Sequence, residues 1–344
     1  MVARLAVVVT AYARAGFVDR AIRSVLDCRI PSTELQTYLV TNVPVLSLHA
    51  DASQVRILRP SPEQTTLGSW IAAAVRQVDA EIVTFLDDDD EYTPDRLTML
   101  RNVFGDSPHC GYYHNAILAP EASGGSARSH GSSGEQPPPL LLNQGRRTRS
   151  SIEVAWKAGA AFNHSCIAVR RGFLEPLLPE LEHLSGGYSA FLFYAALASN
   201  WDLLLDPRPF TRYHIHAANE SPLASGGGRV WWERSLRLAE SRRADAQRII
   251  AYVSRSRPGL HTRPVNRVRL RSELLIELGR PRPRRATLAR LLGGLIADQR
   301  AEEAWHDRGL LLRAGACLLA PEYFSPARLS APTLAPVFGV DGSS

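Results

Sequence analysis

Short apolar runs recur along the first part of the chain and predict strands that are buried on both faces. These runs lie at residues 4–11, 35–40, 55–58 and 81–86. The first is rich in valine, as buried parallel strands commonly are. Between the runs, Phe17 to Leu26 and Leu67 to Val78 repeat apolar residues at helical spacing. The pattern therefore predicts strands that alternate with helices.

The pattern changes twice further along the chain. Residues 120–150 are rich in Gly, Ser and Pro, and this composition predicts a mobile loop because it cannot bury a core. Apolar runs then predict a strand at 166–169, a helix at 191–198 and a strand at 201–205. Residues 221–228 have the composition of a linker. Helices are predicted beyond it at 231–253, 265–278, 286–299 and 301–319.

These elements predict an α/β fold with a mostly parallel central sheet flanked by helices. Strands that alternate with helices form right-handed crossovers, and such sheets bind ligands at the carboxyl ends of their strands. Residues 1–225 would form this domain, and residues 226–344 would form a C-terminal helical region. Because Thr10 to Tyr12 and Asp87 to Asp90 each follow a predicted strand, we expect both segments at the carboxyl ends of the strands, where ligands bind.

The composition, 45% hydrophobic and 22% charged, is that of an ordinary globular protein. The four cysteines are scattered without zinc-site spacing, which favours reduced thiols in a reducing compartment. The first apolar run indicates a strand rather than a signal peptide, and no run reaches the about 20 apolar residues that span a bilayer. We therefore expect a cytoplasmic protein.

The acidic run Asp87–Asp90 is the strongest candidate for chemistry. Adjacent carboxylates behind a buried strand are costly unless a cation is held among them. A helix-loop-helix calcium site is excluded, because its sixth and twelfth positions would hold Tyr92 and Thr98 instead of Gly and Glu. A solvated helix start would account for Asp95 but not for the run itself. A divalent metal that carries phosphates, Mn²⁺ or Mg²⁺, fits best.

Four segments together resemble the family 2 glycosyltransferases of the GT-A fold. They are VVVTAYARAGFVDRAIRSVLDC, TLGSWIAAAV, EIVTFLDDDDEYTPDRL and PFTRYHIHAANES, in the order and spacing of that family. The resemblance covers about residues 3–221, and it is the ordered set rather than any single segment that is specific. It implies a GT-A domain that binds a nucleotide sugar.

The resemblance implies nucleotide-binding roles at matching positions. Thr10 and Tyr12 would border the base, with Tyr12 stacking on it, and Asp87 would contact the ribose. Where the family usually shows an acidic pair after its second strand, this chain has Thr41 and Asn42. Asn42 would therefore take part in base or ribose recognition through its amide.

The resemblance also implies a metal and diphosphate site. Asp89 matches the last residue of the DxD motif and would hold the metal on the diphosphate, while Asp88 and Asp90 are neighbours with no assigned role. His216 matches a histidine that lies near the metal or diphosphate in some members. Arg212 would neutralise phosphate charge.

The general base is where the chain departs from the family. Inverting members place an Asp at the start of the helix before the 201–205 strand, and here Tyr188, Ser189 and Ala190 stand in that place. Because an inverting transfer needs a carboxylate near the acceptor hydroxyl, Glu182 is a weak candidate base. Three alternatives stay open: a base from elsewhere in the chain, an acceptor that is already a phosphate anion, or no catalysis.

The resemblance therefore implies a metal-dependent, inverting glycosyltransferase of the hexosyltransferase type. Its donor would be a nucleotide diphosphate sugar, with UDP as the expected nucleotide. Its acceptor would be an envelope glycan, a polysaccharide or a lipid-linked glycan, so that the reaction would belong to polysaccharide biosynthesis. The alternative is a non-catalytic relative that binds nucleotide sugar or glycan and acts as a scaffold.

The C-terminal region is strongly basic. Residues 229–344 carry 21 Arg and 11 acidic residues, and Trp231 and Trp232 open the first helix. Arg-rich helices with boundary tryptophans adhere to anionic membranes, which would place the protein peripherally at the inner face of the plasma membrane. A packed helical subdomain with a solvated Arg face is the alternative. Nucleic acid is the least favoured partner, because no nucleic-acid motif is present.

Overall fold

The computed structural model describes residues 4–12, 16–43, 52–118, 138–214, 229–298, 314–315 and 318. The chain divides into two compact units. The first unit contains residues 1–215 and also residues 251–261. The second unit contains residues 216–250 and 262–344. The predicted boundary near residue 225 falls outside the described residues.

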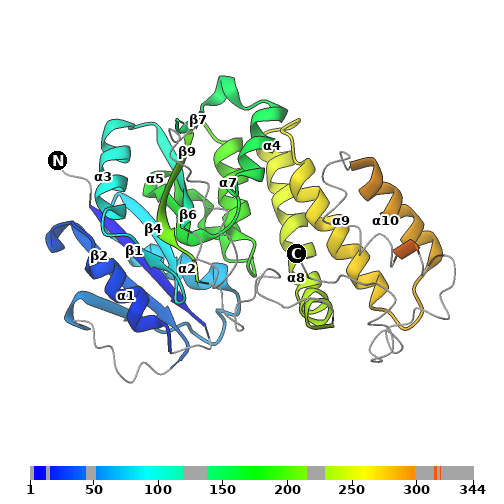
Figure 1. Ribbon diagram of the computed structural model, residues 1–344, viewed down its shortest axis with the longest axis horizontal. Coiled ribbons are helices and arrows are strands. Elements are labelled where there is room, and N and C mark those ends of the chain that lie inside the picture. Colours follow the sequence, from blue (N-terminus) through cyan, green and yellow to red (C-terminus); the bar gives the residue numbers. More distant parts are fainter. Residues whose placement is uncertain are drawn as a thin grey trace, which may run out of the picture. The chain divides into compact units, whose positions relative to one another are not determined.

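A nine-stranded sheet forms the centre of the first unit (Figure 1), with the order β3-β2-β1-β4-β8-β6-β9-β5 and β7 paired to β9. Its strands are β1 (Leu5–Ala11), β2 (Leu35–Thr41), β3 (Val55–Leu58), β4 (Ile82–Asp87), β5 (Glu91–Tyr92), β6 (Cys110–Leu118), β7 (Leu140–Leu142), β8 (Ile167–Arg170) and β9 (Asp202–Arg212). β1 to β4 are parallel, β6 and β9 are parallel to each other, and β8, β5 and β7 pair antiparallel with their neighbours. The predicted mostly parallel sheet is thus confirmed.

Helices cover both faces of this sheet (Figure 1). They are α1 (Val18–Leu26), α2 (Leu67–Gln77), α3 (Arg96–Asp106), α4 (Arg149–Lys157), α5 (Arg171–Leu174), α6 (Leu178–Leu181) and α7 (Tyr188–Ala198). On one face, α1 and α3 share a core with alternate residues of β1, such as Val7 and Val9. On the other face, the Tyr188 ring of α7 meets the Phe85 ring of β4 at 6.4 Å. Burial on both faces explains why β1 and β4 are continuous apolar runs.

Every strand and helix predicted before residue 212 is present, and their ends agree within a few residues except at β9, which continues seven residues beyond the expected 201–205. The sequence did not predict β5, β6 or β7, and β6 carries the polar pair His114 and Asn115 within its run. Regular structure resumes at Leu140, ten residues before the end of the expected loop. Residues 119–137 of that loop lie outside the described residues.

The second unit is helical in its described part. Its helices are α8 (Arg229–Ser256, up to residue 250), α9 (Arg263–Leu278) and α10 (Arg285–Asp298). α9 and α10 share an apolar core that includes Leu274, Leu291 and Leu295. The helix expected at 301–319 lies almost entirely outside the described residues. Among the described helices, none has the length and apolar content needed to cross a bilayer.

Candidate metal centre

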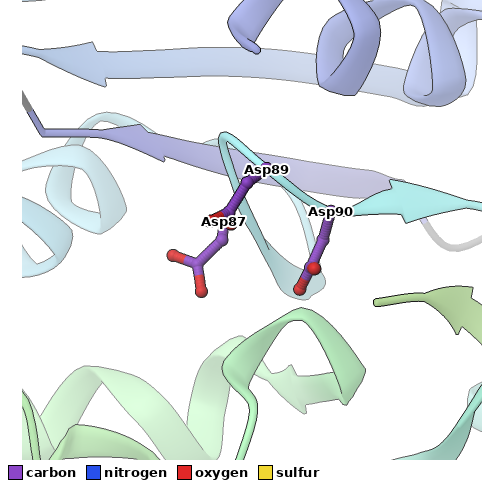
Figure 2. Close-up of side chains that lie close together, drawn as sticks. All are labelled: Asp87, Asp89 and Asp90. Carbon is purple, nitrogen blue, oxygen red and sulfur yellow. The ribbon is translucent and has the colours of Figure 1, made fainter. Parts of the chain in front are cut away.

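Three carboxylates gather at the carboxyl end of β4. Asp87, Asp89 and Asp90 each offer one oxygen, and these oxygens all lie within 4.8 Å of one another (Figure 2). The backbone turns sharply here, because the Asp90 N–H donates to the Asp87 carbonyl at 3.2 Å. The Asp88 N–H donates to the Thr10 carbonyl at 3.1 Å, which ties the turn to the end of β1. The turn thus folds the acidic run into a cluster at the carboxyl ends of the strands, where the sequence predicts a ligand site.

Asp90 is held in an environment that is unfavourable for its charge. Asp90 is only 1% exposed, and neither of its carboxylate oxygens has a hydrogen-bond partner among the described residues. Burial, followed by the nearby charges of Asp87 and Asp89, raises the pKa of Asp90 to about 7, while Ser165 and His164 oppose the shift. A buried carboxylate without partners is stabilised by a cation placed beside it.

The residues present therefore fit a divalent cation. The donor set is made of hard carboxylate oxygens, as Mg²⁺ and Mn²⁺ prefer, and two of those oxygens lack protein donors. Asp87 and Asp89 come together as the sequence predicts, and the structure adds Asp90 to them.

His164 and Ser165 complete the cluster, and the sequence did not point to either residue. The His164 Nε2 atom lies 2.5 Å from Asp87 Oδ1. The Ser165 hydroxyl accepts from the Asp87 backbone N–H at 3.0 Å. Burial lowers the pKa of His164, but the carboxylates of Asp87, Asp90 and Asp89 together raise it above its ordinary value. His164 therefore offsets part of the negative charge on Asp87.

The loop that carries His164 is held in a defined conformation. Asn163 has φ 51°, in the left-handed region, and its side-chain oxygen accepts from the Ser165 N–H at 3.0 Å. β8 follows directly and runs antiparallel to β4, so the start of β8 lies at the carboxyl end of β4. The sequence predicted this strand but gave no signal for its direction. That direction is what brings His164 to Asp87.

The residues predicted to contact the nucleotide lie at the ends of β1 and β2. The Thr10 hydroxyl donates to Asp87 Oδ1 at 3.3 Å. Tyr12 is 59% exposed, and its ring leans on Trp70 with centroids 5.6 Å apart. Asn42 is exposed in the bend after β2. An exposed, supported ring such as Tyr12 offers a stacking surface for a planar ligand group.

Three basic side chains surround Glu91, directly after the acidic run. Glu91 pairs with Arg20 at 3.0 Å, with His214 at 2.6 Å and with Arg212 at 3.5 Å. Arg20 also donates to the Asp89 carbonyl at 3.3 Å, so this basic group adjoins the carboxylates. Arg212 is thus placed near the metal centre, whereas His216 lies outside the described residues. No sequence pattern singles out Arg20 or His214.

Glu182, the candidate base, is bound to α2. Its carboxylate forms an ion pair with Arg76, and its carbonyl accepts from the Thr66 hydroxyl at 2.6 Å. Tyr188, Ser189 and Ala190 stand where the family's Asp is expected, and the Tyr188 ring lies 4.7 Å from that of His164. Burial, followed by the charges of Asp87 and Asp90, raises the pKa of Tyr188 well above its ordinary value. Tyr188 therefore stays protonated and cannot replace a carboxylate base.

The sequence pattern of the family described as glycosyl transferase family 2 matches residues 6–177, which is half of the chain. The matched segment contains the three clustered carboxylates together with His164 and Ser165. No curated protein matches the chain in sequence.

Solved structures share the fold at low identity. TarS from S. aureus matches with a TM-score of 0.53 and 13% identity, over 91% of this chain and 53% of that one. The chain thus spans about half the length of TarS. The mannosyltransferase PcManGT from Pyrobaculum calidifontis, in complex with GDP-Man and Mn²⁺, matches with a TM-score of 0.53 and 14% identity, over 94% and 88% of the two chains. TarS 1–349 in complex with UDP-GlcNAc matches with a TM-score of 0.50 and 12% identity, over 92% and 88%. The GT-A fold expected from the sequence is confirmed.

Proposed function

The chain belongs to glycosyl transferase family 2, and we propose that it transfers a hexose from a nucleotide diphosphate sugar to an acceptor with the help of a divalent cation. The observation that carries this proposal is the cluster of Asp87, Asp89 and Asp90 at the carboxyl end of β4. The GDP-Man and Mn²⁺ bound to PcManGT, and the UDP-GlcNAc bound to TarS 1–349, support it.

Asp89 and Asp90 would hold Mn²⁺ or Mg²⁺, and Asp87 lies close enough to contribute an oxygen to the metal or to bind the ribose. When bound, the cation would neutralise the leaving diphosphate as a Lewis acid. His164 holds Asp87 in place from the protein side, and the Ser165 hydroxyl holds its backbone. These contacts fix the carboxylates before ligand arrives.

The donor would lie along the ends of β1, β2 and β4. Tyr12 is exposed and supported by Trp70, so it would stack on the base, which we propose to be uracil. Thr10 and Asn42 would provide polar contacts next to it. Arg20 and Arg212 would interact with the diphosphate once Glu91 releases them, because Arg binds phosphate oxygens in a fork geometry.

We propose inversion at the anomeric carbon, with an envelope, polysaccharide or lipid-linked acceptor. Glu182 stays the candidate base, and its ion pair with Arg76 keeps it bound to α2 in the described conformation. Transfer to a hydroxyl through Glu182 would need that pair to break. An acceptor that is already a phosphate anion would need no base.

Slow hydrolysis of the donor tests the enzyme against the scaffold alternative. Purified protein is incubated with Mn²⁺ and UDP-GlcNAc, UDP-glucose or GDP-mannose, and released nucleotide is measured. We expect release that falls at least 100-fold in Asp89→Asn and is unchanged in the control Asp95→Asn, whose side chain is 62% exposed and pairs with Arg29. Binding of a donor without release, also in the presence of glycan acceptors, would favour the scaffold.

A further inference from the structure

A basic cavity of about 420 Å³ lies in the first unit. Arg147, Arg149, Arg257 and His261 line it together with the turn at residues 258–260. Three arginines and a histidine around one cavity are a favourable environment for an anion. None of these residues belongs to the metal centre described above.

The cavity lies at the amino ends of the parallel strands, whereas the metal centre lies at their carboxyl ends. The Arg147 guanidinium donates to the carbonyl of Trp201, the residue directly before β9 begins. β9 is parallel to β6, and β8 pairs antiparallel with both β6 and β4, so β9 and β4 run in the same direction. The start of β9 is therefore separated from Asp87 by the length of a strand, about 20 Å for six residues. A nucleotide sugar held at Asp87 would not fill this cavity.

Two guanidinium groups converge inside the cavity. Arg147 Nη1 donates to the Leu197 carbonyl at 3.0 Å, and Arg257 Nη1 donates to the same carbonyl at 3.1 Å. Burial and the neighbouring charge of Arg257 lower the pKa of Arg147 to about 10, while Asp202 opposes the shift. Neither arginine forms an ion pair with a carboxylate in the part of the chain that the structure describes. Two adjacent cations without a counter-ion are stabilised by a bound anion.

Arg147 also has a donor that is not satisfied. The residue is 9% exposed, and its Nε atom has no hydrogen-bond acceptor among the described residues. Its described bonds go to the carbonyls of Leu197, Ser199 and Trp201, which fix the guanidinium in place. Such buried donors carry an energetic cost that an acceptor oxygen from a ligand would remove.

The rim of the cavity is held in a fixed shape. The Leu260 N–H donates to the Arg257 carbonyl at 3.2 Å, and Gly259 has φ +83°, as the third position of a type II turn requires. On the other side, Arg149 and His261 both pair with Glu153, at 3.3 Å and 3.1 Å. Arg257 uses one of its five N–H donors in its described bond. The structure describes no acceptor for its other donors, and Arg257 lines the cavity.

We propose that this cavity binds the phosphate group of an anionic ligand. The planar fork of Arg257 matches the geometry of phosphate oxygens, and Arg147 adds positive charge beside it. A volume of about 420 Å³ admits a phosphate with a small group attached. This proposal does not depend on the proposed glycosyl transfer, since the two sites lie at opposite ends of the parallel strands.

Calorimetric titration of the full chain with inorganic phosphate at pH 8, in a phosphate-free buffer of fixed ionic strength, tests the proposal. We expect saturable binding that weakens about tenfold or more in Arg257→Gln and in Arg149→Gln, because each loses a charge-assisted hydrogen bond. Arg257→Lys should bind more tightly than Arg257→Gln. Arg146→Gln is the matched control, since Arg146 is exposed, lies in the same segment and does not line the cavity. Thermal melting of each variant checks that the fold is kept.

These titrations show whether the cavity binds phosphate and which kind of molecule carries it. No saturable phosphate binding by the wild-type chain, or equal loss in Arg146→Gln and Arg257→Gln, would overturn the proposal. Titration with water-soluble dihexanoyl phosphatidic acid then distinguishes the source of the phosphate. Tighter binding than inorganic phosphate, lost in the same variants, would assign a lipid headgroup, and equal or weaker binding would assign a free phosphate. Donor hydrolysis by Arg149→Gln should match that of the wild type.

Discussion

The Asp90 carboxyl group combines burial with two neighbouring carboxylates, and this combination governs how the metal-free site responds to pH. Its folded-state pKa of about 7 lies above the ordinary value of 3.8. The folded state therefore binds a proton at Asp90 more tightly than the unfolded state does. Its contribution to stability is present below about pH 4 and is lost as the pH rises toward 7. His164, whose pKa is also raised, acts in the same direction.

Replacing Asp90 by Asn should therefore stabilise the metal-free protein. The gain should be small at pH 4, grow between pH 4 and 7 and level off above pH 7, where it reaches roughly 2–4 kcal/mol. Urea unfolding in EDTA at a series of pH values measures it. Asp95→Asn, at an exposed carboxylate, should show no such growth. A gain in Asp90→Asn that does not change with pH would contradict the assigned environment.

The residues of the site differ in how far the sequence could predict them. Asp87 and Asp89 were predictable because a carboxylate run behind an apolar strand is a local pattern. His164 and Ser165 were not, because their role depends on β8 running antiparallel beside β4. Asp90 has no role assigned from the sequence, because a sequence does not show how a turn directs successive side chains.

At the scale of elements, the start of α2 shows how closely the helices pack. A Cβ atom on Gly68 would lie 2.0 Å from the Leu181 carbonyl oxygen and 2.8 Å from that of Leu184. The Gly68 N–H also donates to the Leu184 carbonyl at 3.0 Å. Both obstacles are backbone atoms, so they cannot move aside as a flexible side chain can. This contact holds the segment before α7 against α2.

Gly68→Ala should accordingly destabilise the protein by roughly 3 kcal/mol. Gly105→Ala in α3 provides the matched comparison, because its Cβ would meet nothing within 4 Å. That change should be neutral or stabilise by up to about 1 kcal/mol through helix propensity. Chemical denaturation of both variants measures the difference. Equal stabilities would show that residues 181–184 do not pack on α2 as described.

The elements themselves were largely predictable where burial produces a clear period. β1 and β4 are nearly continuous apolar runs, and α2 repeats apolar residues at helical spacing. β5 was missed because it has two residues, and β6 because polar residues interrupt its run. Strand order beyond β4 depends on long-range pairing, which no local pattern encodes.

At the scale of the whole molecule, the first unit is completed by a segment far along the chain. Residues 251–261 place the Tyr252 ring 5.1 Å from Phe191 and pair Arg255 with Glu180 at 2.8 Å. A chain ending at residue 225 would lose these contacts, whereas one ending at residue 261 would keep them. We expect the shorter chain to melt about 5 °C lower or more in differential scanning calorimetry. Equal melting temperatures would mean that residues 251–261 contribute nothing to the first unit.

The basic second unit remains our candidate for membrane contact. Part of its charge is compensated within the unit, as where Glu277 binds Arg280 and Arg284, each at 3.2 Å. We expect the full chain to sediment with vesicles containing phosphatidylglycerol at low salt and to be released by about 0.5 M NaCl, because screening weakens surface attraction. A chain ending at residue 261 should bind much less. Equal sedimentation of both chains would place the membrane contact outside residues 262–344.

Calorimetric titration of the purified chain with UDP-, GDP- and TDP-sugars, with and without Mn²⁺ or Mg²⁺, tests the central claim most directly. We predict that at least one donor binds with a Kd between about 1 µM and 1 mM when a metal is present. Binding should be lost in EDTA and in Asp89→Asn, because the clustered carboxylates would no longer hold the cation. Failure of every nucleotide sugar to bind in the presence of either metal would contradict the assignment of the carboxylate cluster as a nucleotide-sugar site.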